Sequence, residues 1–173
     1  MTREWEGLSL KDSAVCQQEI FEYFLKKNKI EVAVEIGTMN GAGAKLLSKY
    51  ANRVYTLDIV SKEHLISILP KNVTIIQIKD NLEKKVFLES MNFDFAFVDG
   101  DHTELGVLLD FECVKKCGRV LFHDYRVGDN TKWSGPREAI RELGIKVEVR
   151  EPFAYWEISN GAVQEKQYRG WIK

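Results

Sequence analysis

The sequence predicts an α/β fold, in which a doubly wound, mostly parallel sheet of seven strands carries helices on both faces. Short runs of β-branched and aromatic residues alternate with helix-like stretches along the chain, as is typical of parallel strands joined by helical crossovers. The last two strand-like runs, residues 145–149 and 153–158, lie too close together for a crossover helix. We therefore expect them to pair as an antiparallel hairpin at the C-terminal end of the sheet.

The first half of the chain supplies a helix and then alternating strands and helices. The first helix has apolar residues at near-helical spacing, and Asp12 or Ser13 can cap its start. Apolar or β-branched runs predict the strands, and the stretches between them predict helices, one of which Pro70 ends. The expected elements are helices at residues 12–28, 42–50 and 61–69 and strands at residues 31–36, 53–59 and 73–78.

The second half continues the same alternation. The runs FDFAFV and GRVLFH predict two further strands, and the stretches before and after them have helical periodicity. The expected elements are helices at residues 81–91, 103–116 and 134–143 and strands at residues 93–98 and 118–123. Because no repeat, low-complexity tract or linker interrupts the pattern, we expect residues 1–173 to form a single domain.

Composition narrows the class of protein. The net charge of −1 gives no reason to expect binding to nucleic acid or to an anionic membrane. No apolar run approaches the roughly 20 residues that span a bilayer, and the start MTREWEGLSLKD has no signal-peptide core. We therefore expect a cytoplasmic protein with reduced cysteines. Cys113 and Cys117, four residues apart, are expected to be buried apolar residues; half of a zinc site is the alternative.

A glycine-rich turn is the most informative motif of the chain. The run VEIGTMNGAG places Gly37, Gly41 and Gly43 between a predicted strand and a predicted helix. Glycine permits a sharp bend and a close approach of ligand to backbone, and the exposed N–H groups of a helix start favour a polar or anionic ligand. The spacing G-x-x-x-G-x-G differs from the G-x-G-x-x-G that binds a dinucleotide pyrophosphate.

Acidic residues follow the predicted strands. Asp58 lies 21 residues after Gly37, close to the ~20 residues at which an acid binds ribose hydroxyls in a βαβ unit. The alternative is an ordinary strand-end acid that faces solvent. Asp80, Asp99 and Asp124 also follow strands, and the carboxyl ends of parallel strands meet at one edge. Because converging carboxylates repel each other, that edge favours a cationic ligand, such as a sulfonium with an ammonium group, or a divalent metal.

The chain resembles the class I S-adenosylmethionine-dependent methyltransferases over roughly residues 12–160. The resemblance rests on the loop VEIGTMNGAG, the acid Asp58, and the phrases IKDN, FDFAFVDGDH and GRVLFHDY, in that order. These phrases are similar in particular to the small O-methyltransferase-like branch, some members of which hold magnesium beside the substrate. The resemblance implies a Rossmann-like fold, a methyltransferase activity and S-adenosyl-L-methionine as cofactor.

The resemblance also implies roles for single residues. Asp58 would bind the ribose diol, Asp80 would accept from the adenine amine, and Asp99 would lie near the methionine amino group and the reactive methyl. The loop residues would surround the methionine part and the sugar: Glu35, which precedes the loop, and Gly37, Thr38, Gly41 and Gly43.

Two histidines are candidate general bases beside Asp99, which we expect at the catalytic centre. His102 follows the fourth strand and His123 ends the fifth, and either could take the proton of a hydroxyl acceptor. Alternatively, Asp99, His123 and Asp124 hold a metal ion, if the chain turns at Asp124. Histidine favours manganese, iron or zinc over magnesium. The structural alternatives are an imidazole bonded to a backbone carbonyl for His123 and a turn residue for His102.

The expected function is therefore methyl transfer to an oxygen atom of a small-molecule acceptor. A nicotinamide-dependent oxidoreductase and a non-catalytic cofactor-binding module remain as alternatives. Trp133, in the long segment after the fifth strand, is expected to stack on substrate or to pack. The C-terminal segment with Tyr168 and Trp171 is expected to dock on the sheet, and pairing with a second subunit in a homodimer is left open.

Overall fold

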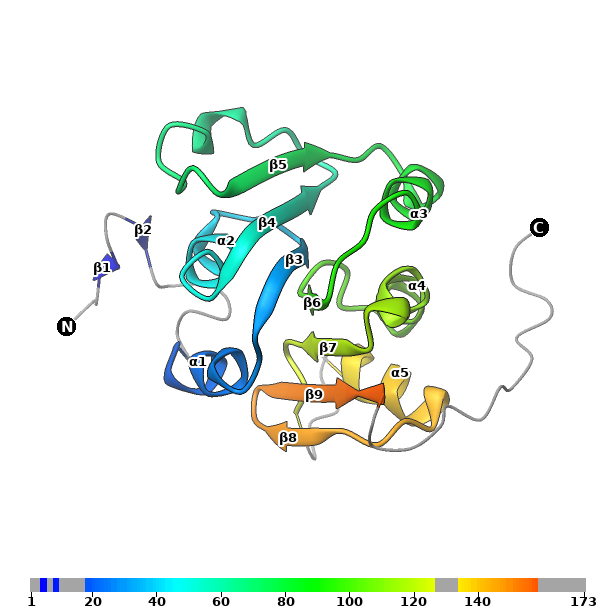
Figure 1. Cartoon of the computed structure of the whole chain (residues 1–173). Helices are drawn as coiled ribbons and strands as arrows, with labels where there is room; N and C mark the ends of the chain where they lie inside the picture. Colours follow the sequence, from blue (N-terminus) through cyan, green and yellow to red (C-terminus); the bar gives the residue numbers. More distant parts are fainter. Residues whose placement is uncertain (1–3, 6–7, 10–17, 127–133, 159–173) are drawn as a thin grey trace.

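The structure, a computed structural model, describes residues 4–5, 8–9, 18–126 and 134–158. Its centre is a seven-stranded sheet with the order β5-β4-β3-β6-β7-β9-β8 (Figure 1). The first five of these run parallel, and β9 is antiparallel to both β7 and β8. The strands are β3 (Ile30–Ile36), β4 (Ala51–Asp58), β5 (Val73–Gln77), β6 (Phe95–Val98), β7 (Arg119–Phe122), β8 (Glu148–Arg150) and β9 (Phe153–Glu157). A separate two-stranded ribbon joins β1 (Glu4–Trp5) and β2 (Leu8–Ser9).

Helices cover both faces of the sheet, α1 and α2 on one side and α3, α4 and α5 on the other (Figure 1). They are α1 (Gln18–Lys26), α2 (Ala42–Leu47), α3 (Asn81–Glu89), α4 (Glu104–Val114) and α5 (Gly135–Leu143), with short 3₁₀ turns η2 (Glu63–Leu65) and η3 (Lys115–Cys117). The predicted fold class, a Rossmann-like doubly wound sheet with a C-terminal antiparallel hairpin, is confirmed.

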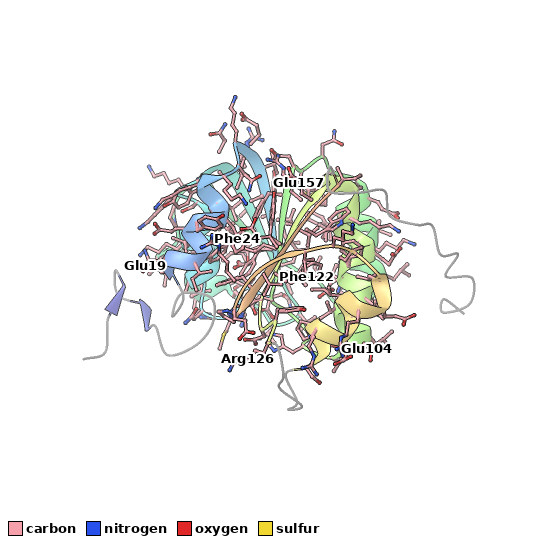
Figure 2. All side chains as sticks on the ribbon, turned by 90° about the horizontal axis from the view of Figure 1, so that it is seen from below. Glu19, Phe24, Glu104, Phe122, Arg126 and Glu157 are labelled. Atoms are coloured by element: carbon pink, nitrogen blue, oxygen red, sulfur yellow. The ribbon has the colours of Figure 1, made fainter. Side chains whose placement is uncertain are left out.

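Two apolar cores hold these layers together. On the α1 side, the ring of Phe21 lies 4.5 Å from that of Phe97 and 5.4 Å from that of Phe153. On the other side, the ring of Phe111 from α4 packs on Phe122 and Trp156. Figure 2 shows interior rings such as Phe24 and Phe122 among the elements, with Glu19 and Glu104 at the periphery. Alternate strand residues point to opposite faces, so one sheet serves both cores.

One predicted helix is wrong. Residues 61–69 were expected to be helical, but only the 3₁₀ turn η2 forms there. Leu65 is buried in this stretch, whereas Ile66 and Ile68 are 66% and 49% exposed. A helix in a globular protein is stabilised mainly by burying an apolar face, and this segment buries too little of one. The other expected elements are present, with bounds that differ by a few residues; residues 12–17 of the first helix lie outside the described part of the chain.

The strand order reverses at β3. The chain continues from β3 to β4 on one side and later returns to β6 on the other, so β3 and β6 flank the topological switch point. Ligands of open α/β sheets bind at the carboxyl ends of the strands beside such a point. Here those ends carry the glycine loop after Ile36 and the Asp99–Gly100 segment after Val98. The fold therefore places two of the predicted motifs side by side.

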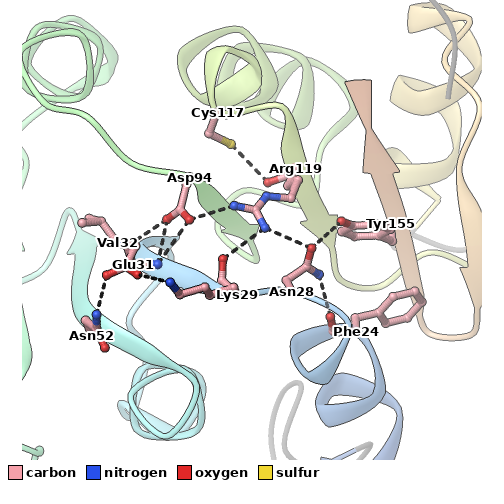
Figure 3. Close-up of polar contacts among 10 residues, drawn as sticks. All are labelled: Phe24, Asn28, Lys29, Glu31, Val32, Asn52, Asp94, Cys117, Arg119 and Tyr155. Atoms are coloured by element: carbon pink, nitrogen blue, oxygen red, sulfur yellow. Dashed lines mark hydrogen bonds and ion pairs between the residues drawn. The ribbon is translucent and has the colours of Figure 1, made fainter. Parts of the chain in front are cut away.

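The opposite edge of the sheet is closed by a polar network (Figure 3). Arg119, at the start of β7, donates to Asp94 Oδ2 over 2.7 Å and to Asn28 Oδ1 over 3.2 Å. Asp94 also accepts from the backbone N–H of Val32, and Tyr155 donates to Asn28. These contacts join the amino ends of β3, β6 and β7 to one another and to Tyr155 in the antiparallel strand β9. Their donors and acceptors satisfy one another, so this network serves to hold the strands together.

No helix in the described stretches of the chain is long and apolar enough to cross a membrane.

Candidate active site

The glycine loop is shaped by contact with the neighbouring strand. Gly37 has a φ of +98°, and a Cβ built on it would lie 2.2 Å from the carbonyl oxygen of Asp99. Its backbone N–H donates to the carbonyl of Leu57, so the loop is fixed between β4 and β6. Glycine is required here by the left-handed backbone and by the approach of a second chain segment. A side chain at Gly37 would therefore meet the backbone of Asp99.

Glu35 lies beneath the loop. It is 1% exposed, and its Oε2 accepts a hydrogen bond of 2.5 Å from Thr56 Oγ1, which lies 2.7 Å from Thr38 Oγ1. A Cβ on Gly43 would lie 2.1 Å from Glu35 Oε1, so this glycine makes room for the carboxyl group. Burial raises the pKa of Glu35 well above its ordinary value, although the bond from Thr56 opposes the rise. The predicted loop residue Glu35 therefore has partners inside the protein.

Asp58 stands at the end of β4, beside the glycine loop. Its Oδ2 accepts from the backbone N–H of Met39 over 3.1 Å, and its Oδ1 accepts from that of Val60 over 2.9 Å. Lys62 lies 3.4 Å away, and both side chains of this ion pair are less than one fifth exposed. The carboxylate thus ties the loop to β4 at the position where the sequence predicted a ribose acceptor.

Asp80 caps the start of α3. Its Oδ1 accepts from the backbone N–H of Glu83 over 2.8 Å, which satisfies one of the free N–H groups of the first turn. The residue is exposed. Gly41 is the N-cap of α2 and has a left-handed backbone, with a φ of +80° and no side-chain cap.

Asp99 is the centre of a compact cluster of acids and histidines. Its Oδ1 lies 2.8 Å from His123 Nδ1 and 3.3 Å from His102 Nε2. Its side chain is 10% exposed, that of His123 is 6% exposed, and that of His102 is 25% exposed. The His123 ring packs against Phe97 and Phe153, which direct Nδ1 toward the carboxylate. His102 is the more accessible of the two predicted bases.

Asp124 completes the cluster because the chain turns there. It has a φ of +54°, and its Oδ1 and Oδ2 lie 3.5 Å from His123 Nδ1 and 3.6 Å from His102 Nε2. The predicted turn at this residue is confirmed. Ligand atoms of Asp99, His123 and Asp124 all lie within 4.8 Å of one another, the only such group of three in the described residues. Strained backbone of this kind clusters at functional sites.

The protonation states of the cluster follow from its contacts. Burial acts to raise the pKa of Asp99, but the hydrogen bonds of His102 and His123 outweigh it, so the net shift is downward. The hydrogen bond to Asp99 raises the pKa of His102, against the opposing effect of its own partial burial. When no other cation is present, Asp99 and His102 therefore favour their charged forms, a carboxylate beside an imidazolium.

Other candidates lie elsewhere or remain undescribed. Cys113 is buried in α4, as expected, whereas Cys117 is only partly buried and its thiol lies 3.1 Å from the carbonyl of Arg119. Burial raises the pKa of Cys117 to about 11. Neither cysteine belongs to a group of three ligands in the described parts of the chain. Trp133 and the C-terminal segment lie outside the described residues.

Sequence reasoning missed two features of this edge. Thr56, inside β4, links Glu35 to Thr38, and nothing in its local pattern distinguishes it from an ordinary strand threonine. Asp110, inside α4, is 1% exposed and pairs with Lys84. Here a signal was present, because Asp110 falls on the helical stripe formed by Val107, Phe111 and Val114.

The fold has known counterparts. No protein-family model matches this sequence, and curated proteins give no significant match. Among solved structures, the MycE methyltransferase of the mycinamycin biosynthetic pathway, in complex with Mg, SAH and mycinamycin VI, aligns with a TM-score of 0.62 at 17% identity over 90% of this chain. This chain spans only 51% of the length of that one.

Two further structures match along most of both chains. An O-methyltransferase from Bacillus cereus in complex with SAH gives a TM-score of 0.62 at 18% identity, over 87% of this chain and 84% of its own. A precorrin 8W decarboxylase from Methanobacterium thermoautotrophicum gives 0.60 at 22% identity, over 84% and 91%. The chain therefore has the fold of class I S-adenosylmethionine-dependent methyltransferases, a fold that also hosts an enzyme described as a decarboxylase.

Proposed function

We propose that this protein is an S-adenosylmethionine-dependent methyltransferase that methylates an oxygen atom of a small molecule. The observation that carries the proposal is the convergence of Asp58, Asp99 and Asp124 on the carboxyl edge of the sheet, next to the glycine loop. S-adenosylmethionine carries a sulfonium and an ammonium group, both of which such an edge attracts. Asp58 would bind the ribose and Asp99 the ammonium group, with Asp80 toward the adenine.

The same charges argue against a nicotinamide dinucleotide. Its pyrophosphate would add two negative charges at the start of α2, where Asp58 and Asp99 already lie. Gly43 of the glycine loop faces the buried carboxyl group of Glu35. Gly37, Thr38 and Gly41 shape the loop around the methionine part in this proposal, and Glu35 supports it from beneath.

The acceptor is proposed to be a hydroxyl group because a base stands beside the expected methyl position. His102 contacts Asp99 and Asp124 and keeps a quarter of its side chain exposed. The cationic cofactor bound beside Asp99 would oppose protonation of His102, and the neutral imidazole could then take a proton from an incoming acceptor. His123 is too deeply packed to meet substrate and instead positions Asp99. A small-molecule acceptor is consistent with the near-neutral charge of the chain, and MycE was crystallised with mycinamycin VI.

The residues at this edge also fit a divalent cation. Two carboxylates and one imidazole offer three ligand atoms within 4.8 Å of one another. Small shifts of these side chains can place the three atoms around one ion. Asp99, His123 and Asp124 would hold the ion, which when bound would lower the pKa of an acceptor hydroxyl. A nitrogen donor favours manganese, iron or zinc over magnesium. His102 would then remain the group nearest the acceptor.

Ligand binding tests the cofactor assignment. We expect S-adenosylmethionine and S-adenosylhomocysteine to raise the unfolding temperature and to bind in isothermal titration, and NAD to do neither. At a ligand concentration of 100 times Kd, the stabilisation is about 2.7 kcal/mol. Stabilisation by NAD alone would overturn the proposal in favour of an oxidoreductase.

Turnover tests the reaction. We expect S-adenosylhomocysteine to form when a library of small hydroxyl compounds, including catechols and sugars, is offered with S-adenosylmethionine. His102→Gln should lower the rate by about 10²–10⁴ without weakening cofactor binding. Tight cofactor binding with no turnover on any acceptor class would indicate a non-catalytic binding module instead.

A further inference from the structure

A buried ion pair lies behind the candidate site. Asp110 of α4 is 1% exposed and contacts Lys84 of α3, whose side chain is 12% exposed. Charged side chains are rarely buried to this extent, because each loses its hydration. Apolar residues at the same two positions would give a core that is at least as stable. Stability alone therefore does not account for this pair.

Asp110 is also incompletely paired. Lys84 bonds to Oδ1, whereas Oδ2 is the only buried side-chain nitrogen or oxygen in the described residues that has no hydrogen-bond partner. Burial raises the pKa of Asp110, although the charge of Lys84 opposes the rise. Lys84 is thus the main group whose charge compensates the buried carboxylate of Asp110.

The unpaired oxygen faces the backbone of the candidate site. A Cβ built on Gly100 would lie 3.4 Å from Asp110 Oδ2 and 3.0 Å from Ile36 Cγ2. Asp110 Oδ2 therefore lies close to Gly100, which directly follows Asp99. A substitution at Asp110 would alter the packing beside the segment that carries Asp99 and His102.

The other partner reaches the opposite part of the site. Lys84 lies in the first turn of α3, and its backbone N–H donates to the carbonyl of Asp80 over 3.1 Å. Asp80 caps α3, and Thr103 caps α4 by accepting from Gly106. The pair thus joins α3, which Asp80 caps, to α4, which begins five residues after Asp99.

We propose that Lys84 and Asp110 are positioning residues, which fix the Asp80 loop and the Asp99–Gly100 segment at the separation that the cofactor needs. This inference rests on the proposed function, because it takes S-adenosylmethionine to span from Asp80 to Asp99. A ligand held at both ends binds tightly only if the two ends are preorganised, so a small relative shift costs affinity. Neither side chain touches the cofactor.

Paired variants separate positioning from stability. Asp110→Asn keeps the volume but leaves Lys84 without its partner, and should lower both the unfolding temperature and the affinity for S-adenosylhomocysteine. The double variant Lys84→Met with Asp110→Leu replaces the pair by apolar side chains and should restore the unfolding temperature. Its affinity should stay weaker than that of the wild type by about tenfold or more. Glu112→Gln, which breaks the exposed pair with Lys115 on the same helix, is the matched control and should change neither quantity.

Affinity that returns with stability in the double variant would show that the pair only stabilises the fold, and so would a folded Asp110→Asn protein of wild-type affinity. Hydrogen exchange of the wild-type protein gives a test that needs no variant: S-adenosylhomocysteine should slow exchange in the first turn of α3 and in residues 99–103 together. Protection of one segment alone would overturn the inference. If the wild type binds no S-adenosylhomocysteine at all, the proposed function itself has failed.

Discussion

His123 Nδ1 lies 2.8 Å from Asp99 Oδ1, although the two residues follow different strands and are 24 positions apart in the chain. The contact exists because β6 and β7 are neighbours in register, with Val98 opposite Phe122. It directs the imidazole and the carboxylate at each other from adjacent strand ends. Asp124 reaches the same point only because its backbone turns to a positive φ.

Asp58→Ala should weaken binding of S-adenosylhomocysteine. Loss of two charge-assisted hydrogen bonds to the ribose diol costs about 2–4 kcal/mol, or roughly 30- to 1000-fold in Kd. The variant should remain folded, since Asp58 lies at a strand tip and bonds only to loop N–H groups and Lys62. Isothermal titration measures the loss, and Glu63→Ala on the exposed turn η2 is the control. A folded variant with wild-type affinity would contradict the ribose assignment.

Gly43→Ala should destabilise the protein through a steric conflict with Glu35. The added Cβ would lie 2.1 Å from Glu35 Oε1, and overpacking of this kind costs about 1–3 kcal/mol. Urea denaturation measures the loss. Gly144→Ala is a useful contrast, because its Cβ meets nothing within 4 Å and only its φ of +62° is unfavourable. In a protein that also carries Glu35→Asp, Gly43→Ala should reduce the free energy of unfolding by less. If the losses of stability from the two substitutions are strictly additive, Glu35 is not the side chain that the added Cβ meets.

His123→Asn should change which metal the site prefers. The wild-type nitrogen donor favours manganese or zinc, and an amide oxygen in its place should shift the ratio of affinities toward magnesium. Equilibrium dialysis of the metals with the protein measures this ratio without an activity assay. Asp99→Asn is the control, because loss of a carboxylate should weaken all three metals. An unchanged ratio of affinities in His123→Asn would show that His123 is not a metal ligand. If the wild-type protein binds none of these metals, the proposed metal site is wrong.

His102→Gln should destabilise the metal-free protein more at acidic than at alkaline pH. The hydrogen bond to Asp99 raises the folded-state pKa of His102, so its stabilisation is fully present below the unfolded value of about 6.5 and is lost as the pH rises through the folded value. The pKa of Asp99 is lowered overall, so the stabilisation from its carboxylate is lost only in stronger acid, below about pH 4. The ion pair between Asp99 and His102 therefore stabilises the protein most between about pH 4 and about pH 6.5.

Urea denaturation in EDTA at about pH 5.5 and pH 9 measures the difference between His102→Gln and the wild type. We expect the larger difference at the lower pH. His64→Gln, at an exposed histidine of η2, controls for the loss of a histidine as such. A difference that is equal at both pH values, or larger at pH 9, would contradict the ion pair between His102 and Asp99.

Local patterns were sufficient for much of the fold. Short β-branched runs and glycine or proline breaks placed the strands and most helices, because side-chain periodicity and backbone restrictions act over a few residues. The spacing from Gly37 to Asp58 placed an acid at the next strand end, where the structure has it. The stretch 61–69 failed because its helical periodicity was not matched by a surface on which to bury it.

The candidate site, too, was predictable from the sequence only in part. The sequence by itself determined which acids and histidines lie at the strand ends, since each follows an apolar run within a few residues. Only the tertiary structure decided that Asp99, His102, His123 and Asp124 meet. It also placed Gly37 against a backbone carbonyl and Glu35 against Gly43. It likewise paired Asp110 of α4 with Lys84 of α3. Strand neighbours, close approaches and buried charges depend on contacts between distant segments. Local spacing does not encode these contacts, because they arise when the sheet orders its strands and the helices pack on its two faces.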